Sequence, residues 1–280
     1  MHLLLDIGGT NLRVAASYNG KTLVAPKIIP TPKQFREGVA IIAHFGKLFS
    51  NRKKISNVII GIAGPLTKEK TGVASLLVSS KLRDWVKKPL QQALQRSLHA
   101  PVYIENDASM VGLGEAMYGA GKGKSIVAYI TISTGVNGTR IVDGHIDTSS
   151  YGFEIGQQII HDTQHDKSSG MFARLEDNIS GTSLIKKYGT HPRHIRKMSV
   201  WRDLARYLAY GVNNTIVYWS PDIVVLGGSM MKTPGIPLDL VKKYTRKTTR
   251  IFTHLPEIKK ATLKDFGGLY GALAYIKEIK

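Results

Sequence analysis

Two glycine-rich turns and an aspartate have the residue types that polypeptides use to hold phosphate groups. Asp6 ends the apolar run HLLL, and the turn Gly8-Gly9-Thr10-Asn11 follows it almost directly. A second turn, Thr134-Gly135-Val136-Asn137-Gly138, follows the apolar run SIVAYITIS. Because glycine has no Cβ, such turns can adopt positive φ and bring backbone N–H groups close to phosphate oxygens. Asp6 could hold Mg²⁺ through water beside a phosphate chain.

Both turns also have a simpler interpretation as ordinary β-hairpins. Asn137-Gly138 by itself would suit a type I′ turn between two strands. Neither turn fits the single-loop phosphate pattern GxxxxGK[ST], which disfavours that class of nucleotide-binding protein. The carboxylate of Asp6 at the end of the first strand favours the phosphate interpretation over the plain hairpin.

A further acidic candidate, Asp107, stands beside Asn106 where the apolar stretch PVYIEND passes into the helical pattern DASMVGLGEAMYG. Side chains at such a strand end can project into a site, so Asp107 is a candidate general base. The alternative is that Asp107 only caps the helix, which aspartate does well at such positions.

The composition limits the classes of protein to which the chain can belong. Its 280 residues are 42% hydrophobic, enough for a full globular core. No apolar run approaches the roughly 20 residues that span a bilayer, so we expect a cytoplasmic protein without membrane contact. There is no cysteine, which leaves oxygen or imidazole ligands for any metal. The net charge of +19 would attract polyanions, although we interpret the basic run at 240–250 as the solvated face of a helix.

Apolar patterning predicts the elements that position these candidates. Strands are predicted within 2–9, 57–65, 101–107, 125–135 and 221–229, and helices within 34–51, 87–98, 107–119, 198–219 and 267–279. The alternation is typical of an α/β protein. An internal echo accompanies it, because DIGGTNLRVA recurs loosely as STGVNGTRIV and NVIIGIAGP as DIVVLGGS. The echo suggests a duplicated domain with a cleft between the two copies.

Five motifs in this order resemble those of the ROK sugar kinases, a family with the two-domain actin-like ATPase (ribonuclease H-like) fold. DIGGTNLR and STGVNG are similar to the two phosphate motifs of that family, and PDIVVLGGSM to its adenosine motif. ENDASMVGLGE is similar to the stretch with the catalytic aspartate, and LEDNISGTSL to the pattern L-E-x-x-x-S-G. The resemblance implies an interdomain cleft, with residues 1–118 plus 267–280 in an N-terminal α/β domain and 119–266 in a C-terminal α/β domain.

The resemblance also implies a role for each matching residue. Asp107 would be the general base that accepts a proton from a sugar hydroxyl while this hydroxyl attacks the γ-phosphorus of Mg-ATP. The implied sugar-binding residues are Asn106, Glu154, Gln157, Glu176 and Gly64. The residues implied to bind ATP, with Mg²⁺ held through water by Asp6, are Asp6, Gly8, Gly9, Thr10, Asn11, Arg13, Thr134, Gly135, Asn137, Gly227 and Gly228.

One departure from the family pattern concerns zinc. Many members have E-x-G-H followed by three cysteines that bind a structural Zn²⁺ with the histidine. Here Gln157 replaces the histidine, and the cysteine positions are occupied by Lys167, Ser169 and Arg174. None of these is a plausible zinc ligand, so we predict no structural zinc. His161 and His165, with Asp162 and Asp166, are interpreted as a solvated loop in preference to a substitute metal site.

Other departures concern the substrates. The amide of Gln157 can both donate and accept hydrogen bonds, so sugar binding could persist with an altered preference. Lys81 takes the place of an asparagine that lies near the sugar in relatives, and Ser133 takes the place of a glycine in the second phosphate motif.

These patterns lead us to expect a kinase that transfers the γ-phosphoryl group of ATP to a hexose, with the 6-OH of glucose as the first choice. One alternative is a hexose kinase that uses inorganic polyphosphate, for which the basic clusters would attract the donor. A second is a sugar-responsive regulator, since the family includes repressors with a helix-turn-helix domain. Only five residues precede Asp6, which disfavours such a domain and a nucleic-acid partner. The resemblance leaves a homodimer open.

Overall fold

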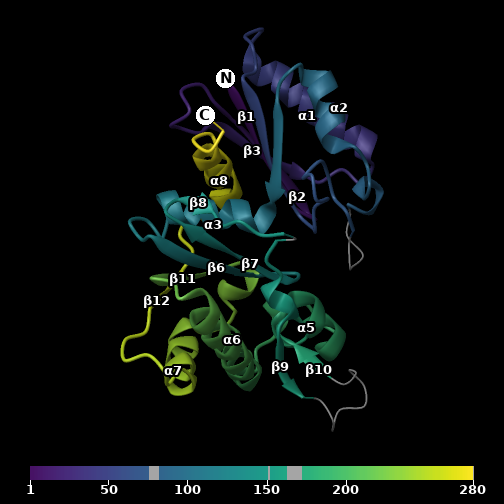
Figure 1. Ribbon diagram of the computed structural model, residues 1–280. Helices are drawn as coiled ribbons and strands as arrows, with labels where there is room; N and C mark the ends of the chain where they lie inside the picture. The colour runs from purple at the N-terminus through teal and green to yellow at the C-terminus, as the bar shows by residue number, and fades with distance from the viewer. Residues whose placement is uncertain (76–81, 151, 163–171, 280) are drawn as a thin grey trace. The chain divides into compact units, whose positions relative to one another are not determined.

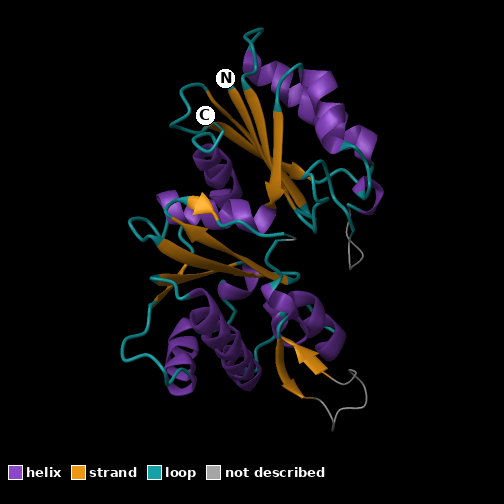
Figure 2. Cartoon of the chain, in the orientation of Figure 1, coloured by secondary structure: helices purple, strands orange, loops and turns teal. Residues whose placement is uncertain are grey.

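The computed structural model describes residues 1–75, 82–150, 152–162 and 172–279, which divide into two compact units (Figure 1). Unit 1 comprises residues 1–118, 148–152 and 263–280, and unit 2 comprises 119–147 and 153–262. Each unit has a five-stranded sheet with helices packed on it (Figure 2). Across the described residues, every helix is too short or too polar to cross a bilayer. Five positions that the sequence singled out lie outside the described residues: Lys81, His165, Asp166, Lys167 and Ser169.

The sheet of unit 1 has the strand order β3-β2-β1-β4-β5. Its strands are β1 (His2–Ile7), β2 (Asn11–Ser17), β3 (Val24–Pro30), β4 (Asn57–Ile62) and β5 (Val102–Asn106). β1, β4 and β5 are parallel, whereas β2 and β3 are antiparallel to their neighbours. The turn after Ile7 therefore closes a hairpin, and its register places Asp6 opposite Arg13.

Helices cover both faces of this sheet. Leu3 and Leu5 of β1 belong to the cluster with α1 (Phe35–Ser50) and α2 (Leu90–Leu98), while Leu4 belongs to the cluster with α3 (Asp107–Tyr118) and α8 (Gly267–Tyr275). Successive residues of a strand point to opposite faces, so an uninterrupted apolar run such as LLL fits a central strand buried on both sides.

Small residues let α3 and α8 approach each other closely. A Cβ on Gly114 would lie 2.4 Å from the carbonyl oxygen of Gly267, and a Cβ on Gly271 would lie 1.7 Å from the carbonyl oxygen of Met110. Both obstacles are backbone atoms, which cannot rotate away as a side chain can. The glycine pattern GGLYG is therefore required by the packing of the two helices.

We expect Gly271→Ala to lower the free energy of unfolding by about 3 kcal/mol, the upper part of the usual range for overpacking in a core. The added methyl group must push α8 away from α3, and this outweighs the helix propensity that alanine gains. Urea denaturation measures the change, with Gln92→Ala at an exposed position of α2 as the control. Equal stability of the two variants would show that α3 and α8 pack less closely than described.

Unit 2 repeats this topology. Its sheet has the order β12-β11-β6-β7-β8, formed by β6 (Ile126–Ile132), β7 (Val136–Val142), β8 (His145–Ile146), β11 (Ile223–Gly227) and β12 (Glu257–Lys260). β6 and β7 form an antiparallel hairpin like that of β1 and β2. β11 pairs with β6 in parallel, as β4 pairs with β1. The echo in the sequence thus corresponds to a repeated arrangement of strands.

Helices and a small hairpin complete unit 2. α6 (Met198–Trp219) and α7 (Leu238–Thr248) pack on one face of the sheet, around Val224, Leu226 and Trp201 (Figure 1). The two-stranded sheet of β9 (Ile159–Asp162) and β10 (Phe172–Arg174) leads into α4 (Leu175–Ile179) and α5 (Gly181–Tyr188).

Asn137 lies inside a strand. It belongs to β7 and pairs with Thr131 of β6, and the connection between the two strands is formed by Ser133, Thr134 and Gly135. The type I′ interpretation of Asn137-Gly138 is therefore wrong, because both residues are used in the ladder.

Candidate active site

In unit 1, Asp6 is a buried carboxylate near the end of β1. Its side chain contacts the guanidinium of Arg13 across the hairpin, with 3.2 Å from Oδ2 to Nη1. A Cβ on Gly268, which belongs to α8, would lie 2.6 Å from Cγ of Asp6. The absence of a side chain at Gly268 therefore provides the space that this carboxylate occupies.

Burial raises the pKa of Asp6 to about 7, because water no longer solvates its charge. Arg13 acts in the opposite direction, and the negative charge of Asp107 raises the pKa further. The structure therefore brings Asp6 and Asp107 into one electrostatic neighbourhood within unit 1, although 100 positions separate them in the sequence.

The turn after β1 is closed by a residue that the motifs did not indicate. The backbone N–H of Gly8 donates to the carbonyl of Asn11 at 3.0 Å. Thr31 holds the turn from outside, since its hydroxyl donates to the carbonyl of Gly8 at 2.7 Å and its N–H to the carbonyl of Thr10 at 2.9 Å. Thr31 follows β3, which pairs with β2, so only the sheet topology reveals this contact.

Asn106 and Asp107 stand where β5 ends and α3 begins. Oδ1 of Asn106 accepts from the N–H groups of Ala108 at 2.9 Å and Ser109 at 3.3 Å, and its amide donates to the carbonyl of Gly64 at 3.2 Å. Asn106 therefore caps α3 and holds Gly64, whose φ of 111° suits glycine. Asp107 is the first residue of α3 and its Oδ1 accepts from the N–H of Ala108 at 2.9 Å.

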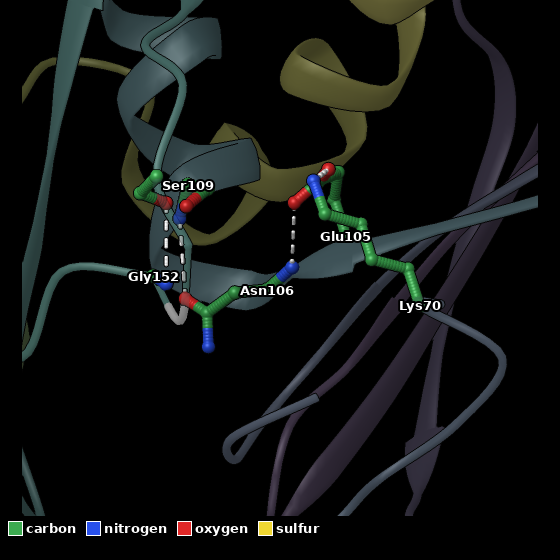
Figure 3. A network of polar contacts seen from close by, with 6 residues as sticks. Lys70, Glu105, Asn106, Ser109 and Gly152 are labelled. Carbon is green, nitrogen blue, oxygen red and sulfur yellow. Dashed lines mark hydrogen bonds and ion pairs between the residues drawn. The ribbon is translucent and has the colours of Figure 1, made fainter. Parts of the chain in front are cut away.

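An ion pair supports this strand end (Figure 3). Glu105 is only 4% exposed and contacts Nζ of Lys70 through Oε1, while its Oε2 accepts from the N–H of Asn106 at 3.3 Å. A buried carboxylate needs a charge or hydrogen-bond partner. The single acid in the apolar strand VYIEN was therefore a sign of a partner elsewhere, but the sequence did not identify Lys70.

Unit 2 holds a second group of polar residues around the turn after β6. Oε2 of Glu176 accepts from the N–H of Val136 at 2.7 Å, and its Oε1 from the amide of Gln157 at 3.4 Å. Burial raises the pKa of Glu154, and the charge of Glu176 adds to this effect. Glu154, Gln157 and Glu176 are thus brought together, as the sugar-binding interpretation requires.

The turn itself is held from two sides in unit 2. At the start of α5, the N–H of Gly181 donates to the carbonyl of Ser133 at 2.7 Å. The hydroxyls of Ser133 and Ser229 are 3.1 Å apart, which connects this turn to the loop after β11. In that loop Gly228 has a φ of 92°, and a Cβ there would lie 2.1 Å from the carbonyl oxygen of Ile132. Ser229 lies in the motif PDIVVLGGSM, but the sequence assigned no role to it.

The glycines of the two turns do not use the positive φ that glycine allows. Gly64 and Gly228 adopt positive φ, but Gly8, Gly9 and Gly135 do not. At Gly135 a Cβ would lie 2.7 Å from Oε2 of Glu176. The neighbouring carboxylate therefore explains the glycine at this position, and the close approach of the turns to phosphate stays a prediction.

Comparison with known proteins identifies the family, since the ROK family model matches residues 3–279. The chain belongs to the ROK family. A glucokinase of Halalkalibacterium halodurans is 27% identical over 280 residues, covering 86% of this chain and 83% of that protein. A ROK hexokinase of Thermus thermophilus has a TM-score of 0.82 at 22% identity, covering 99% of this chain and 98% of the other. A ROK glucokinase of Streptomyces griseus, solved with glucose and AMPPNP, has a TM-score of 0.75 at 22% identity, with 97% of each chain covered.

These solved neighbours confirm the predicted α/β fold of the actin-like ATPase type. In the segment where many ROK members bind zinc, Arg174 directly precedes α4, and its N–H donates to Asp177 at 3.3 Å. His161 stacks on Tyr207 with ring centroids 5.6 Å apart. Within the described residues there is no group of three or more His, Asp or Glu side chains placed to hold a metal ion.

Proposed function

We propose that this ROK protein is a hexose kinase that transfers the γ-phosphoryl group of ATP to a sugar hydroxyl, with the 6-OH of glucose preferred. The observation that carries the proposal is the placement of Asp107 at the carboxyl end of β5, close enough for its charge to act on Asp6. A kinase needs an acceptor for the hydroxyl proton next to the groups that hold the phosphates. The relatives named glucokinase and hexokinase support the same assignment.

In the proposed reaction the carboxylate of Asp107 accepts the proton of the sugar hydroxyl. The hydroxyl oxygen forms a bond to the γ-phosphorus while the bond from this phosphorus to the bridging oxygen breaks, so ADP leaves with the electron pair. Asn106 fixes the direction of the strand end through its bonds to α3 and to Gly64. The backbone N–H groups of Gly9, Thr10, Thr134 and Gly135 would bind the phosphate oxygens, whereas the N–H of Gly8 is used within its own turn.

Asp6 fits the role of a residue that holds Mg²⁺ through water. Its buried charge is only partly compensated by Arg13, as the raised pKa shows, so a cation nearby would stabilise it. Magnesium that arrives with ATP would neutralise charge on the phosphates. Arg13 donates a hydrogen bond to Asp6, so we propose that it orients this carboxylate in addition to any contact that it makes with ATP.

Glu154, Gln157 and Glu176 are proposed to bind the sugar. One oxygen of Glu176 already accepts a hydrogen bond from the N–H of Val136, so this side chain can accept fewer hydrogen bonds from a ligand. A site that must satisfy buried acceptors rejects sugars whose hydroxyls point elsewhere. Because Gln157 can donate or accept, it could serve more than one sugar configuration.

Phosphorylation of a panel of hexoses tests the proposal, measured once with ATP and once with inorganic polyphosphate. We expect the highest turnover for glucose with ATP, and the turnover of its epimers measures how far Gln157 widens the sugar preference. If polyphosphate supports turnover and ATP does not, the protein is a polyphosphate-dependent hexose kinase and the assignment of ATP as donor is wrong. Binding of a sugar without any phosphoryl transfer from either donor would refute the kinase assignment and support a regulator.

Replacement of Glu154 by Gln should raise the KM for the sugar about 10- to 100-fold, the range for loss of a hydrogen bond to a charged group. The KM for ATP should change little, because Glu154 is grouped with the sugar residues of unit 2. Steady-state kinetics with each substrate varied separately measures both constants, and the surface variant Glu257→Gln is the control. A change confined to the KM for ATP would contradict the assignment.

A further inference from the structure

Unit 2 has a recess beside β12, the edge strand of its sheet. It has a volume of about 500 Å³ and is lined by α7, by residues within 249–256 and by the first three residues of β12. Volumes of roughly 300 to 1,000 Å³ are usual for small-molecule sites. Most of the lining precedes β12 in the chain, so the recess lies toward the end of the sheet at which the parallel strands β11 and β12 begin. The turns of unit 2 that are proposed to bind phosphate and adenosine follow the opposite, carboxyl ends of β6 and β11.

Most of the charged side chains that line the recess are cations. Lys242 and Arg246 stand one helical turn apart on α7, and Lys259 faces them from β12. Neither Lys242 nor Arg246 forms an ion pair with any carboxylate that the structure describes. Glu257 is the one acid among the described lining residues and lies 2.9 Å from Lys259. Its pKa is lowered by Lys259 first and also by Lys124 and Lys242, as a local excess of positive charge requires.

Apolar side chains also line the recess. Phe252 is 39% exposed, unusual for a phenylalanine, and Leu255 and Pro256 are half-buried beside it in the chain. A smaller recess of about 240 Å³ shares Phe252, His254, Leu255 and Pro256 and is also lined by Ile216 of α6. The lining therefore combines cations with exposed apolar surface.

We propose that this recess binds a small organic phosphate, a phosphate monoester that carries an apolar ring or chain. The phosphate group would accept hydrogen bonds from the guanidinium of Arg246 and the ammonium of Lys242. The apolar part would cover the exposed ring of Phe252 and remove it from water.

Isothermal titration with phenyl phosphate tests the site, with inorganic phosphate and phenol as probes of each half alone. The titration is made with saturating glucose, AMPPNP and Mg²⁺, so that a kinase site would already be filled. We expect phenyl phosphate to bind at least about tenfold more tightly than either half probe. Equal affinity for phenyl phosphate and inorganic phosphate would overturn the proposal, because the apolar lining residues would then contribute nothing.

Two charge-reversed variants of α7 distinguish binding in the recess from attraction by the net positive charge of the protein. Lys242→Glu with Arg246→Glu should weaken phenyl phosphate binding by about tenfold or more, whereas Lys243→Glu with Lys247→Glu should change it by less than about threefold. The second pair is exposed on α7 but does not line the recess. Equal losses in both variants would refute a localised site and indicate attraction by net charge alone.

A third measurement does not depend on substitutions. Phenyl phosphate should protect the amines of Lys242 and Lys259 from acetylation while Lys243 stays reactive. The folded protein is acetylated, and mass spectrometry then measures the extent of acetylation at each lysine. Lack of protection at saturating phenyl phosphate would place the ligand elsewhere and refute the proposal.

Discussion

Replacement of Asp107 by asparagine is expected to lower kcat about 10²- to 10⁴-fold, the contribution usual for a general base. Asparagine keeps the shape of the side chain and the place at the start of α3, but its amide cannot accept the proton of the sugar hydroxyl. The fold should survive, because Asn106 and not Asp107 accepts the N–H of Ser109 and holds Gly64. Glucose phosphorylation under saturating ATP measures the loss.

Binding measurements separate catalysis from structure in this variant. The Kd for glucose should change by less than about threefold, because the lost function belongs to the transition state. Asp203→Asn on the exposed face of α6 is a matched control that should retain full kcat. Unchanged kcat in the Asp107 variant would remove Asp107 from the mechanism, and a parallel loss of binding and unfolding stability would assign it a structural role.

The largest expected effect on stability comes from ionisation of Asp6. Its pKa is about 7 in the folded chain and near 3.8 when exposed, so the folded state keeps the proton that the unfolded state has lost. The free energy of unfolding should therefore fall as the pH rises from about 4 to 7, by ~4 kcal/mol at 1.36 kcal/mol per pKa unit. Below pH 4 both states are protonated, and above pH 7 both are ionised, so the effect is confined to this window.

Asp6→Asn removes this dependence. Between pH 5 and pH 8 the wild type should lose ~3 kcal/mol relative to the variant, as measured by urea denaturation with a chelator present. Glu69→Gln, at an exposed position of the same unit, should follow the wild type at both pH values. The free energies of unfolding of the wild type and of Asp6→Asn could instead differ by the same amount at pH 5 and at pH 8. That result would show that Asp6 is already ionised at pH 5.

The parts of the fold that could be predicted from the sequence depend on local patterns. Apolar runs that end in glycine turns predict β1, β4, β6 and β11, and three-four spacing predicts α1, α3 and α6. The repeated topology was also visible, because each hairpin keeps its turn and its following arginine in the same order. Asn137 was ambiguous since Asn-Gly fits a turn, and only the pairing with Thr131 places it in a strand.

The chemistry of the candidate site depends on contacts that no local pattern contains. The raised pKa of Asp6 results from burial beside Gly268, which comes from the other end of the chain. The pairing of Glu105 with Lys70 and the support of the first turn by Thr31 are likewise set by the sheet. The residue types of the candidates were predictable, whereas their protonation and their supports required the three-dimensional arrangement.

The packing of α8 against α3 and β1 constrains how the protein is made. Leu4, Ala15 and Ile59 on one face of the first sheet are buried with Leu269 and Leu273, which the ribosome synthesises after the whole of unit 2. Nascent residues 1–118 therefore carry an apolar surface that lacks part of its cover while unit 2 is being translated. Such a surface favours chaperone binding or aggregation until α8 has been made. A stop codon a few residues before Gly267 should therefore destabilise unit 1 more than unit 2, which has just been translated.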